Sequence, residues 1–134
     1  MKNLSGISGL DNLEYLGIKN CKGLHDLSHI SDLKKLSGLQ INDCGITSSN
    51  GLKNLPMLKN INLNDNPQLE SIDKISQISS LEIVTLSGCQ NIKSLVSLTK
   101  LINLSFLRVE KHNLQNIEGI SSLIKPIMEG LRKE

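Results

Sequence analysis

Aromatic residues are almost missing from this chain of 134 residues: they make up 1% of it, with one Tyr, one Phe and no Trp. The hydrophobic content of 38% therefore comes almost entirely from Leu, Ile and Val. A core made of aliphatic side chains of similar size predicts one packing unit that is used again and again. The length is sufficient for a single domain.

An excess of charge of one sign is also lacking, because 15 basic residues face 13 acidic ones and the net charge is +2. Nucleic-acid binding needs a basic stripe that replaces counterions, and the chain has none. Its apolar stretches are too short for membrane insertion. Met1-Lys2-Asn3 is not followed by the apolar segment of a signal peptide.

Cysteine is scarce and odd in number, with three residues. An odd count fits a reducing compartment better than a disulfide framework. Together with the missing signal segment, it favours a cytoplasmic location. A secreted or cell-surface location is expected instead if the chain is a fragment of a longer one.

The chain contains five copies of the pattern L-x-x-L-x-L-x-x-(C/N/H), at residues 13–21, 36–44, 58–66, 81–89 and 104–112. The steps from Leu16 to Leu39, Ile61, Val84 and Leu107 are 23, 22, 23 and 23 residues. Self-similarity at a fixed period of this size is typical of solenoids.

Within each copy the L-x-L segment alternates with period two, which predicts a short strand. Such a strand must pair in parallel with the equivalent strand of the next copy. After the ninth position the apolar period becomes three, as in Leu24, Leu27, Ile30, Leu33 and Leu36. A period of three suits 3₁₀ segments or one-turn helices. We therefore predict an α/β repeat solenoid with a parallel sheet on the concave face and short helical turns on the convex face.

This pattern resembles the leucine-rich repeat family over nearly the whole chain. The length resembles the 22/23-residue class found in bacterial internalins and in a regulator of protein phosphatase-1. The ninth position, often Asn in the family, is Cys21, Cys44, Asn66, Cys89 and His112 here. The resemblance implies a non-catalytic module that binds a protein or peptide ligand through the concave face, as part of a surface, receptor or regulatory protein.

The repeat pattern divides the chain, a single domain over 1–134, into three parts. Residues 1–12 match the back half of a unit and form a partial first repeat, residues 13–125 hold about five repeats, and residues 122–134 form a C-terminal cap or tail. The stretch from Ser122 to Arg132 is expected to be a short helix or turn. The partial first repeat suggests either a truncated array or a minimal one.

The three cysteines fall at the inward ninth position. Cys21 and Cys44 occupy adjacent rungs about 5 Å apart, which permits a disulfide. The alternative is a ladder of buried thiols that bond to loop carbonyls, with Asn66 using its amide in the same way. The spacing of Cys21, His25 and His29 would suit a metal on a helix, but the register puts both histidines on the outer surface. We expect His112 to form a capping hydrogen bond, and we expect no metal, no cofactor and no catalytic group.

The outward strand positions form three columns across the sheet. Tyr15 and Phe106, the only two aromatics, share the first column and are candidate anchors, although each could instead cover an end of the stack. The predicted partner-binding residues are Tyr15, Lys19, Gln40, Asn42, Asn60, Asn62, Asn64, Ile83, Thr85, Phe106, Arg108 and Glu110.

Two further functions fit these residues. The partial first repeat could stack on another copy, giving a self-associating structural solenoid, so the chain is expected to be a monomer or to associate weakly end to end. Amides flanked by an aromatic side chain could instead bind a glycan.

Overall fold

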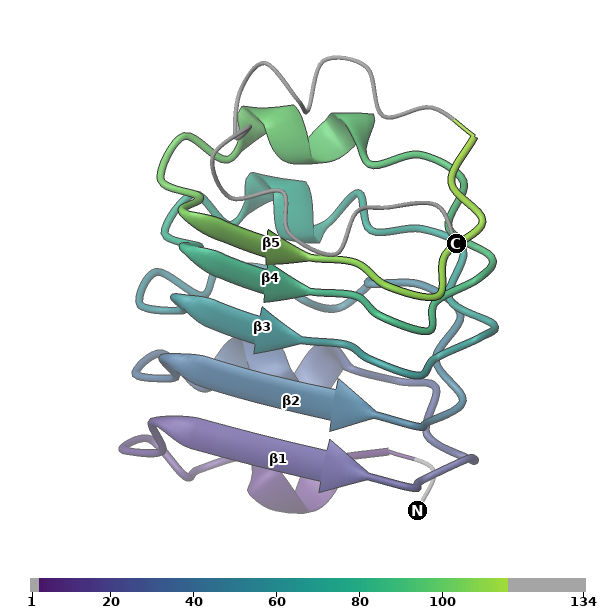
Figure 1. Ribbon diagram of the computed structural model, residues 1–134. Coiled ribbons are helices and arrows are strands. Elements are labelled where there is room, and N and C mark those ends of the chain that lie inside the picture. The colour runs from purple at the N-terminus through teal and green to yellow at the C-terminus, as the bar shows by residue number, and fades with distance from the viewer. Residues whose placement is uncertain (1–2, 116–134) are drawn as a thin grey trace.

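The computed structural model describes residues 3–115, which wind into a stack of short strands with one open sheet (Figure 1). The sheet has five parallel strands in the sequential order β1-β2-β3-β4-β5. Their bounds are Tyr15–Lys19 (β1), Gly38–Asn42 (β2), Asn60–Asn62 (β3), Ile83–Thr85 (β4) and Phe106–Arg108 (β5). Each strand forms one rung of a solenoid, which confirms the predicted fold class.

The strand register confirms the repeat alignment position by position. Leu16 pairs with Leu39, Leu39 with Ile61, Ile61 with Val84 and Val84 with Leu107. The backbone ladder continues past the short strands, since Asp65 N donates to Ser87 O at 2.8 Å and the later rungs are joined in the same way. Every equivalent residue therefore lies beside its counterpart in the next rung.

Short 3₁₀ helices form the convex side behind the sheet, as the period of three predicts (Figure 1). They are η1 (Ser5–Ile7), η2 (Ser28–Asp32), η3 (Ile75–Gln77) and η4 (Val96–Lys100). The unit between β2 and β3, which has the 22-residue step, contains no helix. Gly51 and Asn54 there have φ of 99° and 56°, values that a right-handed helix cannot use. The backbone of Gly51 packs directly on Leu27 and Ser28 at the start of η2.

The core lies between the sheet and the convex turns and is almost wholly aliphatic. The five leucines and isoleucines from Leu24 to Leu36 that carry the period of three are all fully buried, as are Leu39, Ile61, Val84 and Leu107 in the strands. Burying one such side chain contributes roughly 1.5–3 kcal/mol, and in a solenoid most of that depends on the neighbouring rung. Leu10, at the first edge of the stack, is 48% exposed because it has a neighbour on one side only.

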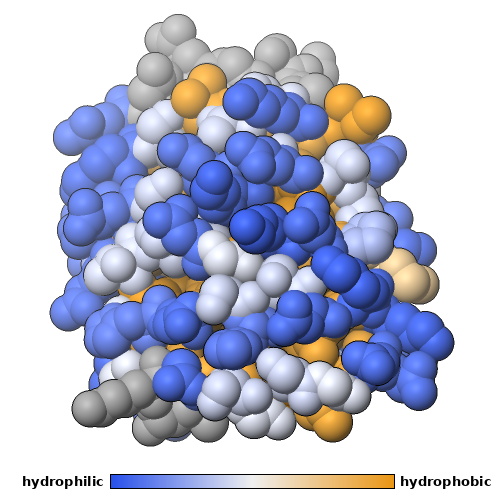
Figure 2. All heavy atoms as spheres, turned by 180° about the vertical axis from the view of Figure 1, so that it is seen from behind, coloured by the Kyte–Doolittle hydropathy of each residue, from blue (hydrophilic) through white to orange (hydrophobic). Residues whose placement is uncertain are grey.

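The predicted C-terminal cap and the end of the fifth repeat lie outside the described residues. Within residues 3–115, no helix has both the length and the apolar character needed to cross a bilayer. Figure 2 shows the convex side covered mainly by hydrophilic residues with small hydrophobic areas between them. Val96 in η4, and Met57 and Ile102 in the turns before β3 and β5, are exposed large apolar side chains.

Candidate functional site

The concave face consists of the outward residues of the five strands and, for β3 to β5, the residue two positions beyond the end of the strand. Its first column is Tyr15, Gly38, Asn60, Ile83 and Phe106, and its second is Gly17, Gln40, Asn62, Thr85 and Arg108. The third column begins with the Lys19–Asn42 pair, and backbone bonds carry it on through Asn64, Ser87 and Glu110. The structure thus brings all twelve predicted binding residues onto one surface.

Tyr15 lies flat along the concave face rather than pointing into solvent. Its Oη donates a hydrogen bond to Gln40 Oε1 at 2.8 Å. A Cβ at Gly38 would come within 2.9 Å of Tyr15 Cδ1, and one at Gly17 would lie 3.4 Å from Tyr15 Cε2. The ring therefore occupies space that two glycines leave free. Tyr15 is still 59% exposed, so the ring remains available to a ligand.

Beside the ring is a small hollow of about 100 Å³, lined by Tyr15, Leu39, Gln40, Asn60 and Asn62. We call it the Tyr15 hollow. It is the one place on the described concave face where an aromatic ring and three amides meet. Gly17 and Gly38, which leave room for the ring, are the sequence signal for this hollow, and the three columns by themselves do not reveal it.

The amides of the third column hold the rungs together. Asn64 N donates to Asn42 Oδ1 and to Asn62 Oδ1, both at 3.1 Å. Asn64 Oδ1 in turn accepts the N–H of Ser87 at 2.8 Å, and Ser87 Oγ accepts the N–H of Glu110 at 3.0 Å. Because these side-chain oxygens accept backbone N–H groups, the Nδ2 groups are what the asparagines offer to a ligand.

The other end of the face differs in chemistry. Ile83 and Phe106 are neighbours in the first column and both are half-buried. The Arg108 guanidinium lies 5.8 Å from the centre of the Phe106 ring and 4.0 Å from Glu110 Oε2. The concave face is therefore rich in amides near β1 to β3 and apolar with a charged rim near β4 and β5.

The inward ninth positions form the thiol ladder that was one of the two alternatives. All three cysteines are free, and their Sγ atoms donate to Lys19 O, Asn42 O and Leu63 O respectively. Burial is the main cause that raises the pKa of Cys44, and it raises the pKa of Cys89 to about 11. Both thiols therefore stay protonated near neutral pH and are poor nucleophiles.

The two remaining polar ladder positions also bond to the backbone. Asn66 is fully buried and donates from Nδ2 to Ile41 O, Leu63 O and Asn64 O at 2.7, 2.8 and 3.3 Å. His112 Nδ1 accepts the N–H of Leu114 at 3.2 Å, which confirms the predicted capping bond.

His25 is exposed and His29 is half-buried on the convex side, where its Nδ1 lies 3.2 Å from Ser8 Oγ. Cys21, by contrast, packs against the core. Among residues 3–115, no three His, Cys, Asp or Glu side chains gather closely enough to hold a metal ion.

A second, open hollow of about 650 Å³ lies along the edge where the strands end, between Lys19 and Lys111. The turn residues along this edge all have positive φ: Asn20, Asp43, Asp65, Gly88 and Lys111. Asp43 forms an ion pair with Lys22, and the Asp65 side chain lies against Gly88. This edge therefore adds charged groups of both signs beside the concave face.

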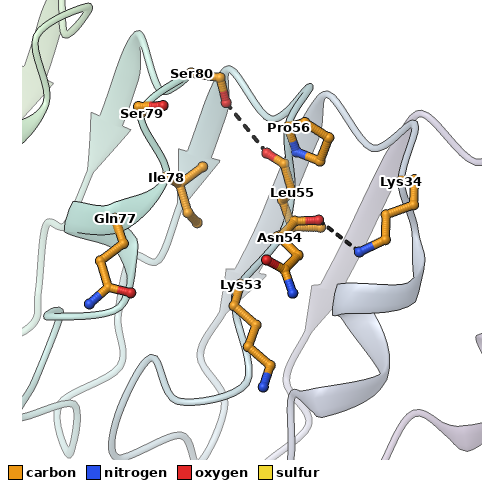
Figure 3. Close-up of a pocket in the computed structure, with 9 residues that line it drawn as sticks. All are labelled: Lys34, Lys53, Asn54, Leu55, Pro56, Gln77, Ile78, Ser79 and Ser80. Carbon is orange, nitrogen blue, oxygen red and sulfur yellow. Dashed lines mark hydrogen bonds between the residues drawn. The ribbon is translucent and has the colours of Figure 1, made fainter.

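A third hollow of about 510 Å³ lies on the convex side, where the unit without a helix meets η3 (Figure 3). Two of its polar groups bond to the framework: Lys34 Nζ donates to Asn54 O at 2.9 Å, and Ser80 Oγ donates to Leu55 O at 3.4 Å. Its shape follows from the missing helix, because the chain there turns at Asn54 instead of filling the space.

No protein-family model and no curated protein matches the chain. Solved structures do match it. An internalin (inlF) from Listeria monocytogenes is 28% identical with a TM-score of 0.76, over 88% of this chain and 34% of that one. Internalin C2 (inlC2) from the same species is 22% identical with a TM-score of 0.61, over 85% of this chain and 59% of that one. The chain thus spans about a third of the first internalin and less than two thirds of the second.

Proposed function

We propose that this leucine-rich repeat protein is a non-catalytic module that binds a protein or peptide ligand through the concave face of its sheet. The observation that carries the proposal is the rigid column with an exposed Tyr15 at one end and the Ile83–Phe106 pair at the other. Large aromatic side chains on a preorganised surface are the usual anchors of protein interfaces. The internalin-like fold supports protein binding in general.

The size of the face limits the expected affinity. Its fifteen outward residues, five in each of three columns, are fewer than the roughly 20–30 residues per side of a standard interface. We therefore expect modest affinity for a short segment. The charged edge between Lys19 and Lys111 is the natural extension of the surface for a larger partner.

A random peptide library displayed on phage and selected on the immobilised chain tests this function. For enriched peptides, we expect Tyr15→Ala and Phe106→Ala each to weaken binding by about tenfold or more. Val96→Ala and Ile102→Ala are matched controls, because they truncate exposed apolar side chains outside the concave columns, and they should change the dissociation constant by less than about twofold. The proposal fails if the concave variants bind as tightly as the wild type.

The alternative of end-to-end self-association rests on the open edge of β1 and on Leu10, which is 48% exposed there. Light scattering over a range of concentrations decides it, since a strict monomer eliminates this function. We also propose a reducing compartment, because the buried Cys44 and Cys89 are free thiols bonded to backbone carbonyls.

A further inference from the structure

We infer that the Tyr15 hollow is a specificity pocket for the carbonyl oxygen of an Asp, Asn, Glu or Gln side chain in the polypeptide ligand. The inference rests on the proposed function and adds the chemical class of the group that the face recognises. The inference follows from the hydrogen bonds that the lining residues already make, because these bonds determine which of their polar groups are still available to a ligand.

The acceptors of two lining amides are in use. Asn62 Oδ1 accepts the backbone N–H of Asn64 at 3.1 Å, and only the oxygen of the amide can do so. Gln40 Oε1 accepts the Tyr15 hydroxyl at 2.8 Å. Asn62 Nδ2 and Gln40 Nε2 are thus left as donors at a site where the third amide, Asn60, is exposed. A donor-rich pocket is complementary to a ligand that presents an acceptor.

The volume of the Tyr15 hollow and the residues that line it further limit the ligand groups that it can bind. A volume of about 100 Å³ is well below the roughly 300–1,000 Å³ of a small-molecule site, so the hollow suits one functional group and not a whole ligand. A carboxylate or carboxamide has three non-hydrogen atoms and is planar, so it can lie against the Tyr15 ring with its oxygen toward the amides. No charged side chain lines the hollow, so both the acidic and the amide forms of the side chain suit it.

The fixed position of the lining groups favours recognition. Tyr15 is held by Gln40 and by the two glycines beneath its ring, and Asn62 is held by the backbone N–H of Asn64 in its own rung. Groups that are already immobilised lose little conformational entropy when a ligand binds, so a small polar contact retains more of its intrinsic affinity.

Nuclear magnetic resonance on the ¹⁵N-labelled full chain tests the pocket directly. The probes are N-acetyl-asparagine-N-methylamide and N-acetyl-aspartate-N-methylamide, with N-acetyl-alanine-N-methylamide as the control that lacks only the side-chain carbonyl. We expect saturable shifts of the Gln40, Asn60 and Asn62 side-chain amides with a dissociation constant on the order of 1 mM. The Asn103 side-chain amide, which donates to Ser79 O on the convex side, should not respond.

Two isosteric substitutions remove a donor and keep the acceptor. Asn62→Asp retains an oxygen for the Asn64 N–H, and Gln40→Glu retains one for the Tyr15 hydroxyl. Each should weaken the aspartate probe by about tenfold, because a donor is replaced by an acceptor that repels the carboxylate, which has no donor of its own. Asn42→Asp is the matched control, since it makes the same change on the same face outside the hollow, and it should leave the probe affinity within about twofold.

The outcomes separate this pocket from the wider function. Absence of saturable shifts, or equal shifts with the alanine probe, overturns the pocket. A response to N-acetylglucosamine alone overturns it as well and assigns the hollow to a glycan. Library peptides that lose affinity with Phe106→Ala but not with Asn62→Asp or Gln40→Glu leave the proposed function standing and reject the pocket.

Discussion

Asn66 and Cys44 are joined across the core, from one rung to the rung before it: Asn66 Oδ1 accepts the Cys44 backbone N–H at 2.9 Å. From the same side chain, Nδ2 donates to Ile41 O and Leu63 O. This fully buried amide satisfies backbone groups of two rungs. The Asn66 side chain thus links its own turn to the preceding rung through hydrogen bonds, which an apolar residue could not form.

Asn66→Ala should therefore be strongly destabilising. It leaves the buried N–H of Cys44 and the carbonyl of Ile41 without their partner, whereas Leu63 O keeps the Cys89 thiol, and each unpaired group costs about 1–3 kcal/mol. We expect the free energy of unfolding, measured in urea, to fall by about 3 kcal/mol or more. Asn66→Cys is the informative control, because three other rungs carry Cys at this position and bond to a carbonyl from Sγ; it should cost clearly less. Equal losses for the two variants would show that volume, not hydrogen bonding, matters there.

The parts of the fold that depend on local pattern were predicted well from sequence. The strand register, the three columns and the inward ladder follow from a period of two and a period of three, which every rung repeats. The helix-free unit was not predicted, because its apolar spacing at Leu52, Leu55 and Leu58 continues the same period while Gly51 and Asn54 take a different backbone conformation.

The details of the candidate site depend on contacts of particular side chains, between rungs and within one rung, and the pattern does not contain them. The position of the Tyr15 ring is set by the absence of a side chain at Gly38, one rung away. The orientation of the Asn62 amide is set by the Asn64 N–H. Both are choices of side-chain rotamer made by particular neighbours, so the columns identify the residues but not the groups that they present.

The Cys89 thiol predicts a loss of stability at high pH. Its pKa is about 11 in the folded protein, against 9.0 for the ordinary value, and burial is the main cause. The contribution of the protonated Cys89 thiol to the free energy of unfolding is fully present below pH 9.0. It is lost as the pH rises toward about 11, because the thiol of the unfolded chain releases its proton first. The slope attributable to this thiol is at most roughly 1.4 kcal/mol per pH unit.

Urea unfolding at several pH values between neutral and alkaline measures this slope. The comparison is between the wild type and Cys89→Ala, because lysines titrate in the same range in both proteins. The variant should be less stable near pH 7 and should lose less stability as the pH rises. Parallel curves for the two proteins would contradict the assigned role of burial.

Gly88→Ala should destabilise the turn after β4. Gly88 has φ of 80°, and an added Cβ would lie 2.4 Å from Asp65 Oδ1 and 3.2 Å from Asp65 Cα. A strained residue of this kind costs about 1–3 kcal/mol. Gly6→Ala is the control, since no atom lies within 4 Å of the added Cβ and its φ is not positive; its stability should stay within about 0.5 kcal/mol of the wild type.

A second substitution identifies the source of the strain at Gly88. Equivalent turns carry Asn20, Asp43 and Lys111 at φ of 53–60°, so positive φ alone is tolerated in this solenoid. Asp65→Gly in the Gly88→Ala background should recover part of the lost stability, because the carboxylate that meets the new Cβ is gone and glycine tolerates the φ of 60° at position 65. If the double variant is no more stable than Gly88→Ala, the strain comes from the backbone and not from Asp65.

Gly38→Ala should separate binding from folding. An added Cβ would come within 2.9 Å of Tyr15 Cδ1 and would displace the ring from its position over Gly38. The ring is 59% exposed, so it can turn away from the new Cβ into solvent, and we expect a change in stability of less than about 1 kcal/mol. Binding of library peptides that depend on Tyr15 should nevertheless weaken almost as much as with Tyr15→Ala, because the hydrogen bond to Gln40 and the wall of the Tyr15 hollow are lost together.

In a double-mutant cycle, Gly38→Ala should have little further effect once Tyr15 is Ala. Additive losses in that cycle would mean that Gly38 acts on the ligand directly and that the seated ring is not what the ligand recognises.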